Sequence, residues 1–501
     1  MPTEQEKLSN PESHLVEAGF TDNAPTYTPP KVDPSLERKL LSKVDLRVMP
    51  ALWFLFLVSF VDRGNLGNAK IEGLERSLGM TGNDYNVAVQ VFTVSYVVFG
   101  LPANIVFKRY GPKVLSIMMF AWGLCTLGQG VTKSFAGLVT CRLLMGICEA
   151  GFVPGCAYLI GAYYKKNEYL RRYSVFFSAS MAAGAFNGLF ANLLSRMHGV
   201  GGYEGWRWIF IIEALITLVV SVASVFLIVP FPEDCTFLNP KEKKLLLDRL
   251  AEDGGNARDD RIELKRVLQM AMDWKIWLAV VGYIGSEETA SSIVAFQPTI
   301  LNQLGWTSSQ AQIHTIPIYA VAFVVNLTCA ILSDRTSKRY VFILFGTICA
   351  IVGWSIQLAQ VPLPRVRYMG MFFVAAGSYL MMCNIVVWLA INLGKGLKRT
   401  VGLGTLISFG NCGAFVSSNV FISSQAPRYP VGFGVGLAMC SMGGLAVTAL
   451  FIGMLLENRR RDRRQGKATE AGTGTVRRYS KQELEQMQGL GEEHPDFRYQ
   501  L

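Results

Sequence analysis

The 501-residue chain has few charged residues, and their placement is uneven. Asp, Glu, Lys and Arg make up 17% of the sequence, against about 25% in ordinary globular proteins. Between Met49 and Glu457 most of the charges lie between long apolar runs, and these runs have the length of membrane-spanning helices. The composition therefore argues against a soluble enzyme, a secreted disulfide-stabilised domain and a nucleic-acid-binding module.

Residues for metal and nucleotide chemistry are also scarce. The chain has four histidines, which are too few for a multi-histidine iron site. It has no Gly-x-x-x-x-Gly-Lys-[Ser/Thr] loop that would bind ATP. Nine of the ten cysteines lie inside apolar runs, and their spacing matches no disulfide framework or metal site. We therefore expect no enzyme activity, no metal and no cofactor.

The apolar runs predict twelve membrane-spanning helices. Their expected bounds are 48–66, 86–107, 113–132, 135–164, 174–196, 206–230, 275–298, 310–332, 340–360, 367–393, 400–423 and 432–456. Pairs of small residues four apart, such as Gly184 and Gly188, predict close helix packing rather than a binding site. The predicted fold is all-α, a polytopic membrane protein with twelve transmembrane helices in two six-helix pseudo-repeats.

Polar segments flank and divide the two predicted bundles. The expected parts are a disordered cytoplasmic tail at 1–47, a six-helix bundle at 48–230, a cytoplasmic central loop at 231–273, a second six-helix bundle at 274–456 and a disordered cytoplasmic tail at 457–501. Within the central loop, residues 239–250 have the pattern of an N-capped amphipathic surface helix. About fifty polar residues precede the first apolar run, so we expect no cleavable signal peptide.

Loop charges predict which way the helices face. Loops on the side of the N-terminus, with the adjoining tail segments, carry 31 Lys and Arg, whereas the opposite loops carry eight. Basic residues collect in cytoplasmic loops, so both termini are expected in the cytoplasm. The net charge of +11 follows from this bias and requires no acidic partner. We expect a monomer in the plasma membrane, with the lipid bilayer and a small substrate as its partners.

Two short basic turns occupy equivalent places in the two halves. One follows the second span and reads Lys-Arg-Tyr-Gly-Pro-Lys over 108–113; the other follows the eighth and reads Ser-Asp-Arg-Thr-Ser-Lys-Arg over 333–339. Such duplication is typical of transporters that bind substrate at the midplane, between their halves. The turn residues predicted to act in gating are Arg109, Gly111, Lys113, Asp334, Arg335 and Arg339.

The informative charges lie inside apolar spans. A charge in the middle of a membrane helix costs about 2.5–3.5 kcal/mol on insertion scales, so such residues are functional candidates. The first span holds Asp62 and Arg63. The fourth holds Arg142 and Glu149, seven residues apart and therefore on one helix face. We expect the four charges to pair around a shared polar cavity; the alternative is an ion-pair network that only fixes helix packing or gates opening.

These segments resemble the major facilitator superfamily, and within it the anion:cation symporters. Residues 62–65 read Asp-Arg-Gly-Asn, similar to the family's Asp-Arg-x-Asn signature. At the first basic turn Lys108 stands near the family's usual Asp, which only the second turn keeps, as Asp334. The motifs that look like the fungal allantoate and nicotinate permease branch lie at 142–155, 205–213, 388–392, 398–399, 410–411 and 457–462.

The resemblance implies roles for the four buried charges. Arg63 and Arg142 match the family's arginines that receive the substrate carboxylate, a role that suits the planar guanidinium fork. Asp62 and Glu149 match the acids that take up the coupling proton, and Glu149 is expected to neutralise Arg142 before substrate arrives. The four charges cancel when all are ionised, so protonating one acid leaves a positive charge for an incoming monoanion.

Four further residues are candidates for the cavity. Glu287 and Glu288 are further candidates for taking up the coupling proton. They are adjacent in the seventh span and point about 100° apart, so at most one is expected to face the cavity. The alternative is that both hydrogen-bond to neighbouring helices. Trp388 and Asn392 are four residues apart on one helix face, and we expect them to line the cavity with an aromatic wall and an amide.

The sequence thus predicts a proton-coupled symporter that imports a small organic anion, a carboxylate such as nicotinate, allantoate or a related metabolite. Two buried arginines favour an anion over a neutral sugar. Two alternatives stay open. One is an exporter of a secondary metabolite or drug on the same fold. The other is a non-transporting nutrient receptor, which usually has a longer cytoplasmic extension than 1–47 or 457–501.

Overall fold

The structure is a computed structural model of the chain. The residues that it describes are 34–252, 269–336, 338–393, 397–464 and 497–501. They divide into two compact units, Met1–Lys43 and Val44–Leu501. The described part of the first unit forms the opening turns of helix α1, and all that follows concerns the second unit.

The described residues are nearly all helical, and they contain no β-strand. The long helices are α1 (Pro34–Ile71), α3 (Asp84–Tyr110), α4 (Val114–Val131), α5 (Phe135–Glu149), α6 (Phe152–Tyr163), α7 (Lys166–Ser195), α8 (Gly205–Leu227), α11 (Trp274–Gln303), α12 (Ser308–Thr336), α13 (Arg339–Leu358), α14 (Pro364–Asn392), α15 (Leu397–Gly410), α16 (Cys412–Val420) and α17 (Pro430–Arg464). The shorter elements are α2 (Leu74–Ser77), η1 (Val200–Gly202), η2 (Pro232–Asp234), α9 (Pro240–Glu252) and η3 (Ser423–Gln425).

The helices match the predicted twelve spans. Ten helices or continuous helix pairs in the described ranges are long and apolar enough to cross a membrane; α5 with α6, and α15 with α16, each form one span. Helix α3 supplies the eleventh when its two segments, bent by 52°, are taken together. Helix α11 is the twelfth span. It has 30 residues, but Glu287 and Glu288 lower its mean hydropathy, so it is not among the ten most apolar spans. The predicted all-α, twelve-helix fold is confirmed.

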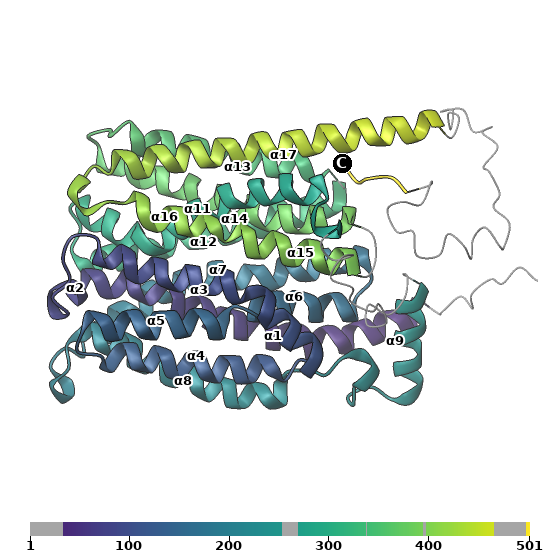
Figure 1. The fold of residues 1–501 in the computed structure, drawn as a ribbon, viewed down its shortest axis with the longest axis horizontal. Coiled ribbons are helices and arrows are strands. Elements are labelled where there is room, and N and C mark those ends of the chain that lie inside the picture. The colour runs from purple at the N-terminus through teal and green to yellow at the C-terminus, as the bar shows by residue number, and fades with distance from the viewer. Residues whose placement is uncertain (1–33, 253–268, 337, 394–396, 465–496) are drawn as a thin grey trace, which may run out of the picture. The chain divides into compact units, whose positions relative to one another are not determined.

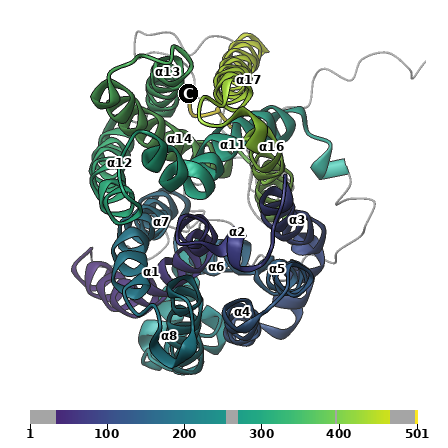
Figure 2. The same cartoon turned by 90° about the vertical axis from the view of Figure 1, so that its left-hand side faces the viewer.

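The spans of the second unit gather in two groups, which Figure 2 shows from one end. In the first group, α4 packs against α5 and α8, and α3 packs against α5. In the second group, α13 packs against α14 and α17, while α11 packs against α14, α16 and α17. Contacts of α7 with α12 and of α3 with α16 join the two groups. These contacts are where the two groups meet.

The helices extend further into the predicted tails than expected. Helix α1 begins at Pro34 and α17 continues to Arg464, so the segments 34–47 and 457–464 are helical rather than disordered. Both segments are rich in residues that favour helix, and extending an existing helix avoids the cost of nucleation. Apart from 497–501, the rest of the predicted tails lies outside the described residues.

The predicted amphipathic helix of the central loop is confirmed as α9. The backbone N–H of Asn239 donates to Glu242 Oε2 at 3.1 Å, which helps to fix where the helix begins. Helix α9 lies at the end of the bundle where α17 also ends (Figure 1). The connections from α3 to α4 and from α12 to α13 reach the same end, which we call the basic end. The other end of the bundle is called the opposite end.

The two helix groups are held together at the opposite end. The Asn86 amide of α3 donates to the backbone oxygen of Phe421 at 3.2 Å. The Ser423 hydroxyl donates to the backbone oxygen of Gly82 at 2.9 Å. Both bonds run from one group to the other, so the groups are in direct contact at this end.

Two glycines allow α7 to approach α12 closely. A Cβ atom added to Gly188 would lie 2.5 Å from the backbone oxygen of Gln312, and one added to Gly184 would lie 2.5 Å from the ring of Tyr319. Neither position has room for a side chain, so these glycines serve the packing of the two groups, as their spacing predicts.

We expect Gly188→Ala to lower the thermal stability of the protein. The clash is with backbone, which cannot turn away, and overpacking of this kind costs about 1–3 kcal/mol. Scanning fluorimetry of the purified protein in detergent measures the change in unfolding temperature. Gly434→Ala on α17 is the matched control, because nothing lies within 4 Å of its added Cβ. An equal effect of the two substitutions would show that the α7–α12 contact is not tight.

Candidate functional site

A cavity of about 110 Å³ lies between the two helix groups. The first group contributes residues of α1, α3, α5, α6 and α7 to its lining, and the second contributes residues of α11, α14, α15 and α16. The cavity is therefore formed by helices that are far apart in the sequence. Among the sequence-predicted residues it brings together Arg63, Arg142 and Glu287.

The walls of the cavity are largely aromatic. The rings that line it are Phe56, Phe60, Tyr85, Phe92, Tyr96, Phe177, Tyr283 and Tyr379. Aromatic faces suit a flat, partly apolar molecule, because stacked and edge-on rings attract one another. Among the described residues no three His, Cys, Asp or Glu side chains are grouped to hold a metal ion. The charged side chains that line the cavity are those of Arg63, Arg142 and Glu287.

Arg63 of α1 is held by an aromatic cage and by one carboxylate. Its Cζ lies 5.0 Å from the ring centroid of Phe60, 5.6 Å from that of Phe92 and 4.8 Å from that of Tyr96. Its Nε donates to Glu149 Oε1 at 2.7 Å. The faces of aromatic rings attract cations, so the guanidinium is stabilised from several sides.

Glu149, at the end of α5, pairs with Arg63 and not with Arg142. Its side chain is fully buried, and Oε1 also accepts a hydrogen bond from Ser59 Oγ at 2.6 Å. No ion pair joins Glu149 to Arg142 among the described residues, although the two groups still interact electrostatically. The seven-residue spacing places the two side chains on one helix face, but Glu149 forms its ion pair with Arg63 of α1 instead.

Arg142 of α5 lines the cavity without an acidic partner. It is 3% exposed, and its Nε and Nη2 atoms have no hydrogen-bond partner. None of the ion pairs between described residues involves Arg142, although Glu149 pairs with Arg63 nearby. A buried cation without a partner is costly, so Arg142 is the group in this cavity best suited to receive an anion.

Of the two adjacent glutamates in α11, only Glu287 lines the cavity. Its Oε1 accepts from Ser291 Oγ at 2.8 Å, and its Oε2 has no hydrogen-bond partner. Glu288 is fully buried and accepts instead from Ser292 at 3.0 Å and Thr289 at 3.3 Å. The structure thus assigns one of the pair to the cavity and the other to hydrogen bonds within its own helix.

Asp62 lies outside the cavity lining and faces α4 and α8. Its Oδ2 accepts from Trp122 Nε1 at 3.1 Å and from Thr217 Oγ1 at 2.9 Å. Glu213, one turn before Thr217 on α8, is 3% exposed and close enough to Asp62 to interact electrostatically. Glu213 was not predicted individually as a site residue; it lies in the motif at 205–213. Its position as an acid inside an apolar span was the signal that could have identified it.

The sequence profile described as the Major Facilitator Superfamily matches residues 52–452. The chain belongs to the major facilitator superfamily. It is therefore a multi-pass membrane transporter, and the family predicted from its motifs is confirmed.

Relatives within the superfamily are fungal transporters. The chain is 33% identical over 481 residues to the MFS-type transporter cnsO of Penicillium expansum, covering 93% of this chain and 90% of that one. It is 31% identical over 404 residues to the high-affinity nicotinic acid transporter of Saccharomyces cerevisiae, covering 80% and 75%. The solved structure of the superfamily's proton:xylose symporter XylE aligns with a TM-score of 0.64 at 14% identity, covering 81% and 95%. The fungal relatives support the fungal permease branch that the motifs of the chain resemble, and the XylE structure shows the fold.

Two residues predicted to line the cavity lie elsewhere. Trp388 Nε1 donates to the backbone oxygen of Gln500 at 2.7 Å, and Asn392 also bonds to Gln500. Helix α14 contributes Tyr379 and Met382 to the cavity instead. Trp388 follows Met382 by six residues and is therefore turned about 120° away around the helix.

The predicted gating residues lie at the basic end of this superfamily member, where α3 meets α4 and α12 meets α13. They are Arg109, Gly111, Lys113, Asp334, Arg335 and Arg339. Gly111 ends α3 with a φ of 83°, a conformation that favours glycine. Arg339 is buried at the start of α13, whereas Arg109 and Arg335 are exposed. Asp334 belongs to α12, but its side chain lies outside the described residues.

Proposed function

We propose that this transporter imports a small organic anion, a carboxylate, together with protons. The observation that carries the proposal is the buried Arg142 guanidinium, which faces an aromatic cavity with two nitrogen atoms unpartnered. A guanidinium fork binds a carboxylate through two parallel hydrogen bonds. The aromatic walls favour a flat substrate body such as a pyridine ring. Nicotinate has both features, and the likeness to a nicotinic acid transporter supports this substrate class.

The charges in and beside the cavity support coupling to protons. Arg63 and Arg142 are balanced by Glu149 and Glu287 when all four are ionised. A monoanion that enters adds one negative charge, and protonation of one acid restores neutrality. Net charge is costly inside a membrane protein, so the anion and the proton are expected to move together. We propose Glu149 as the main proton acceptor, because its protonation would loosen its hold on Arg63.

Asp62 and Glu213 form a second candidate for proton uptake. Both carboxyl groups are buried, and neither forms an ion pair among the described residues. Two buried carboxylates near one another repel, so a proton held between them lowers the energy. This pair lies outside the cavity lining, and a proton there would act on the site through the neighbouring Arg63.

We further propose that the basic end faces the cytoplasm and that the protein acts as a monomer in the plasma membrane. The excess of 31 over eight basic residues on the loops of one side supports this orientation. In this orientation the exposed Arg109 and Arg335 lie at the cytoplasmic mouth, where they can act in gating.

We expect a transport-deficient cell that produces this protein to accumulate labelled nicotinate or a similar aromatic monocarboxylate. Nicotinamide is the matched control, since it keeps the ring but lacks the charge; its uptake should be at least about tenfold lower, because a charge-assisted hydrogen bond contributes about 1.5–3 kcal/mol. A proton uncoupler should reduce the accumulation. Equal uptake of nicotinate and nicotinamide would contradict an anion site, and accumulation that resists the uncoupler would contradict proton coupling.

A further inference from the structure

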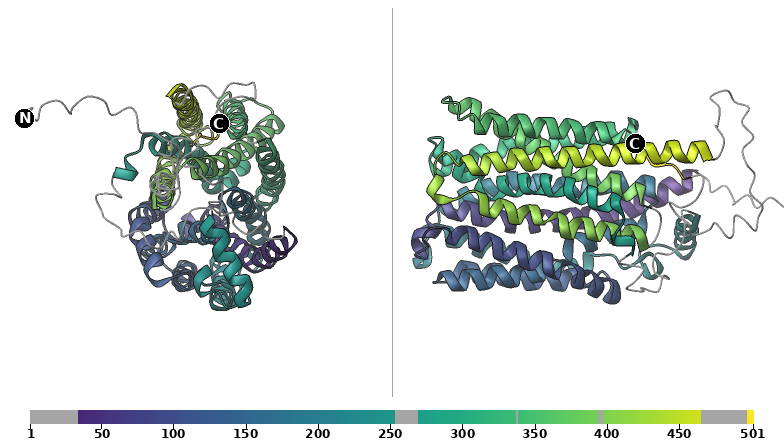
Figure 3. Two further views of the ribbon diagram at one scale, coloured as in Figure 1. Left: turned by 90° about the vertical axis from the view of Figure 1, so that its right-hand side faces the viewer. Right: turned by 45° about the horizontal axis from the view of Figure 1, so that its top comes forward.

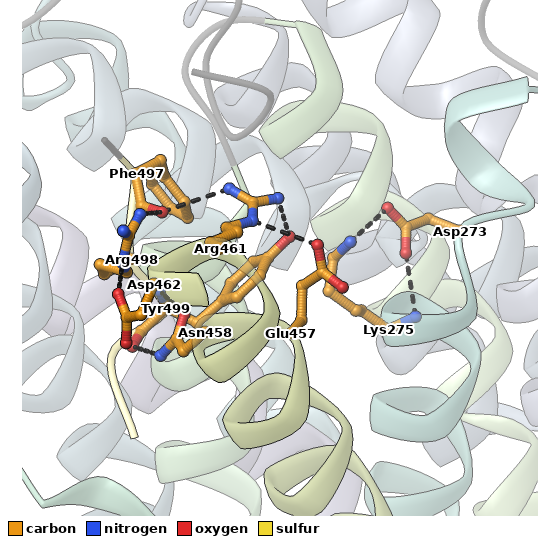
Figure 4. A network of polar contacts seen from close by, with 9 residues as sticks. All are labelled: Asp273, Lys275, Glu457, Asn458, Arg461, Asp462, Phe497, Arg498 and Tyr499. Atoms are coloured by element: carbon orange, nitrogen blue, oxygen red, sulfur yellow. Dashed lines mark hydrogen bonds and ion pairs between the residues drawn. The ribbon is translucent and has the colours of Figure 1, made fainter. Parts of the chain in front are cut away.

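The segment 497–501 lies beside α17 (Figure 3), and two asparagines, Asn458 of α17 and Asn392 of α14, bind its backbone; Figure 4 shows the first of them. Asn458 of α17 donates from Nδ2 to the Tyr499 backbone oxygen and accepts at Oδ1 from the Tyr499 N–H, both at 2.9 Å. Asn392 of α14 accepts from the Gln500 N–H at 2.8 Å and donates to the Gln500 oxygen at 3.1 Å. The backbone N–H and C=O of Tyr499 therefore both bond to the Asn458 amide, and those of Gln500 both bond to the Asn392 amide.

Tyr499 anchors the segment between two basic side chains. Its side chain is 6% exposed. The ring centroid lies 5.1 Å from the Arg461 guanidinium and 5.4 Å from the Lys275 ammonium, and the hydroxyl accepts from Arg461 Nη2 at 3.3 Å. A buried aromatic ring with cations beside it is a typical anchor of a peptide in its binding site.

Further bonds from α14 and α17 complete the site, as Figure 4 shows in part. Trp388 Nε1 donates to the Gln500 oxygen at 2.7 Å, and Arg461 Nη1 donates to the Phe497 oxygen at 3.2 Å. An exposed ion pair joins Arg498 to Asp462 at 2.7 Å and adds less, because solvent screens it. Main-chain bonds supply affinity in such sites and side-chain pockets supply selectivity.

Lys275 connects the docked segment to a contact between the two helix groups. The Nζ atoms of Lys275 and Lys398 both pair with the Asp273 carboxylate, at 2.9 and 2.7 Å. The next residue along α15, Arg399, places its guanidinium 4.3 Å from the ring of Tyr169, which belongs to α7 in the first group. A short chain of side-chain contacts therefore runs from the docked segment to this contact at the basic end.

We propose that the segment 497–501 is an intramolecular ligand of a peptide-binding site at the basic end, and that its docking stabilises the contact between Arg399 and Tyr169. The ligand class is a peptide with tyrosine at the anchor position, and the occupant is this chain's own segment. Docking favours the arrangement in which the two helix groups touch at the basic end, since a ligand shifts a conformational equilibrium toward the state that it binds better. The inference does not depend on the identity of the transported substrate.

Hydrogen–deuterium exchange of the full-length protein in lipid nanodiscs tests the proposal. Asn458→Ala removes two backbone bonds, so amide exchange at Tyr499 and Gln500 should rise by roughly tenfold or more. Exchange should also rise in the peptides that contain Tyr169 and Arg399. Asn419→Ala is the matched control, because Asn419 is exposed on α16 and bonds to a carbonyl of its own helix. The control should leave all of these peptides unchanged.

Two results with Asn458→Ala would overturn the proposal. Unchanged exchange at Tyr499 and Gln500 in Asn458→Ala would refute the docking site. Faster exchange there, with no change at Tyr169 and Arg399, would refute the effect on the contact between groups. Should Asn458→Ala fail to fold, Tyr499→Ala replaces it, because Tyr499 lies outside the helices and its loss should release the segment in the same way. Free peptide Phe-Arg-Tyr-Gln-Leu should then restore the protection at Tyr169 and Arg399, and failure to restore it counts against the site.

Discussion

Arg142→Lys should lower the kcat/KM of anion uptake by about a hundredfold, although it keeps the positive charge. Lysine is a compact ammonium on a flexible stem and cannot form the two parallel bonds of a guanidinium with a carboxylate. Loss of one charge-assisted hydrogen bond costs about 1.5–3 kcal/mol, which corresponds to roughly 10- to 150-fold. Initial rates of labelled nicotinate uptake, measured over a range of concentrations, give the change.

Arg365→Lys is the matched control for this experiment. Arg365 is exposed near the start of α14, away from the cavity, and its replacement should leave uptake unchanged. A normal kcat/KM in Arg142→Lys would contradict the carboxylate site. A large loss in Arg63→Lys alone would move the site to Arg63, whose guanidinium Glu149 already binds.

Glu149→Gln should abolish the accumulation of anion driven by a pH gradient while anion-for-anion exchange continues. Glutamine resembles the protonated acid in shape and charge, so Arg63 loses its carboxylate partner and the site stays ready for an anion. No proton can then be released from this position, and the gradient can no longer drive uptake. Proteoliposomes allow both measurements, accumulation after external acidification and exchange of labelled for unlabelled anion.

The other buried acids serve as comparisons under the same conditions. Asp62→Asn, Glu213→Gln and Glu287→Gln each remove one carboxylate from the pair beside the cavity or from its lining. Accumulation that persists in Glu149→Gln but disappears in Asp62→Asn or Glu213→Gln would assign the proton to the pair of Asp62 and Glu213. If it disappears only in Glu287→Gln, the second helix group carries the proton. If all four variants accumulate normally, coupling through these acids is wrong.

The fold was predictable from the sequence because its signals are local. The length of an apolar run, the helical period of the segment that becomes α9 and the four-residue spacing of Gly184 and Gly188 each require only neighbouring residues. The same holds for the charges inside spans, which point to Arg63 and Arg142 through the cost of placing a charge in a membrane.

The partners of those charges were not predictable in this way. A common helix face suggests that Glu149 and Arg142 interact, but Arg63 on another helix lies nearer to the acid. The faces of Trp388 and Asn392 follow from their spacing, whereas the direction of the cavity depends on how α14 packs against other helices. The polar composition of 457–501 predicts disorder. It does not reveal that 497–501 is held in a site, because that site is built from distant parts of the chain, at Lys275, Trp388 and Asn458.

The lone guanidinium of Arg142 also bears on how tightly the carrier is coupled. Arg63 and Arg142 are balanced by Glu149 and Glu287 when all four are ionised, so a proton that bound without an anion would leave one uncompensated positive charge beside Arg142, which has no ion-pair partner of its own among the described residues. Such a carrier would have to carry that excess charge through the low-dielectric interior, where each unpaired ion costs several kcal/mol. If uptake is coupled to protons as proposed, slippage of protons without an anion should therefore be suppressed.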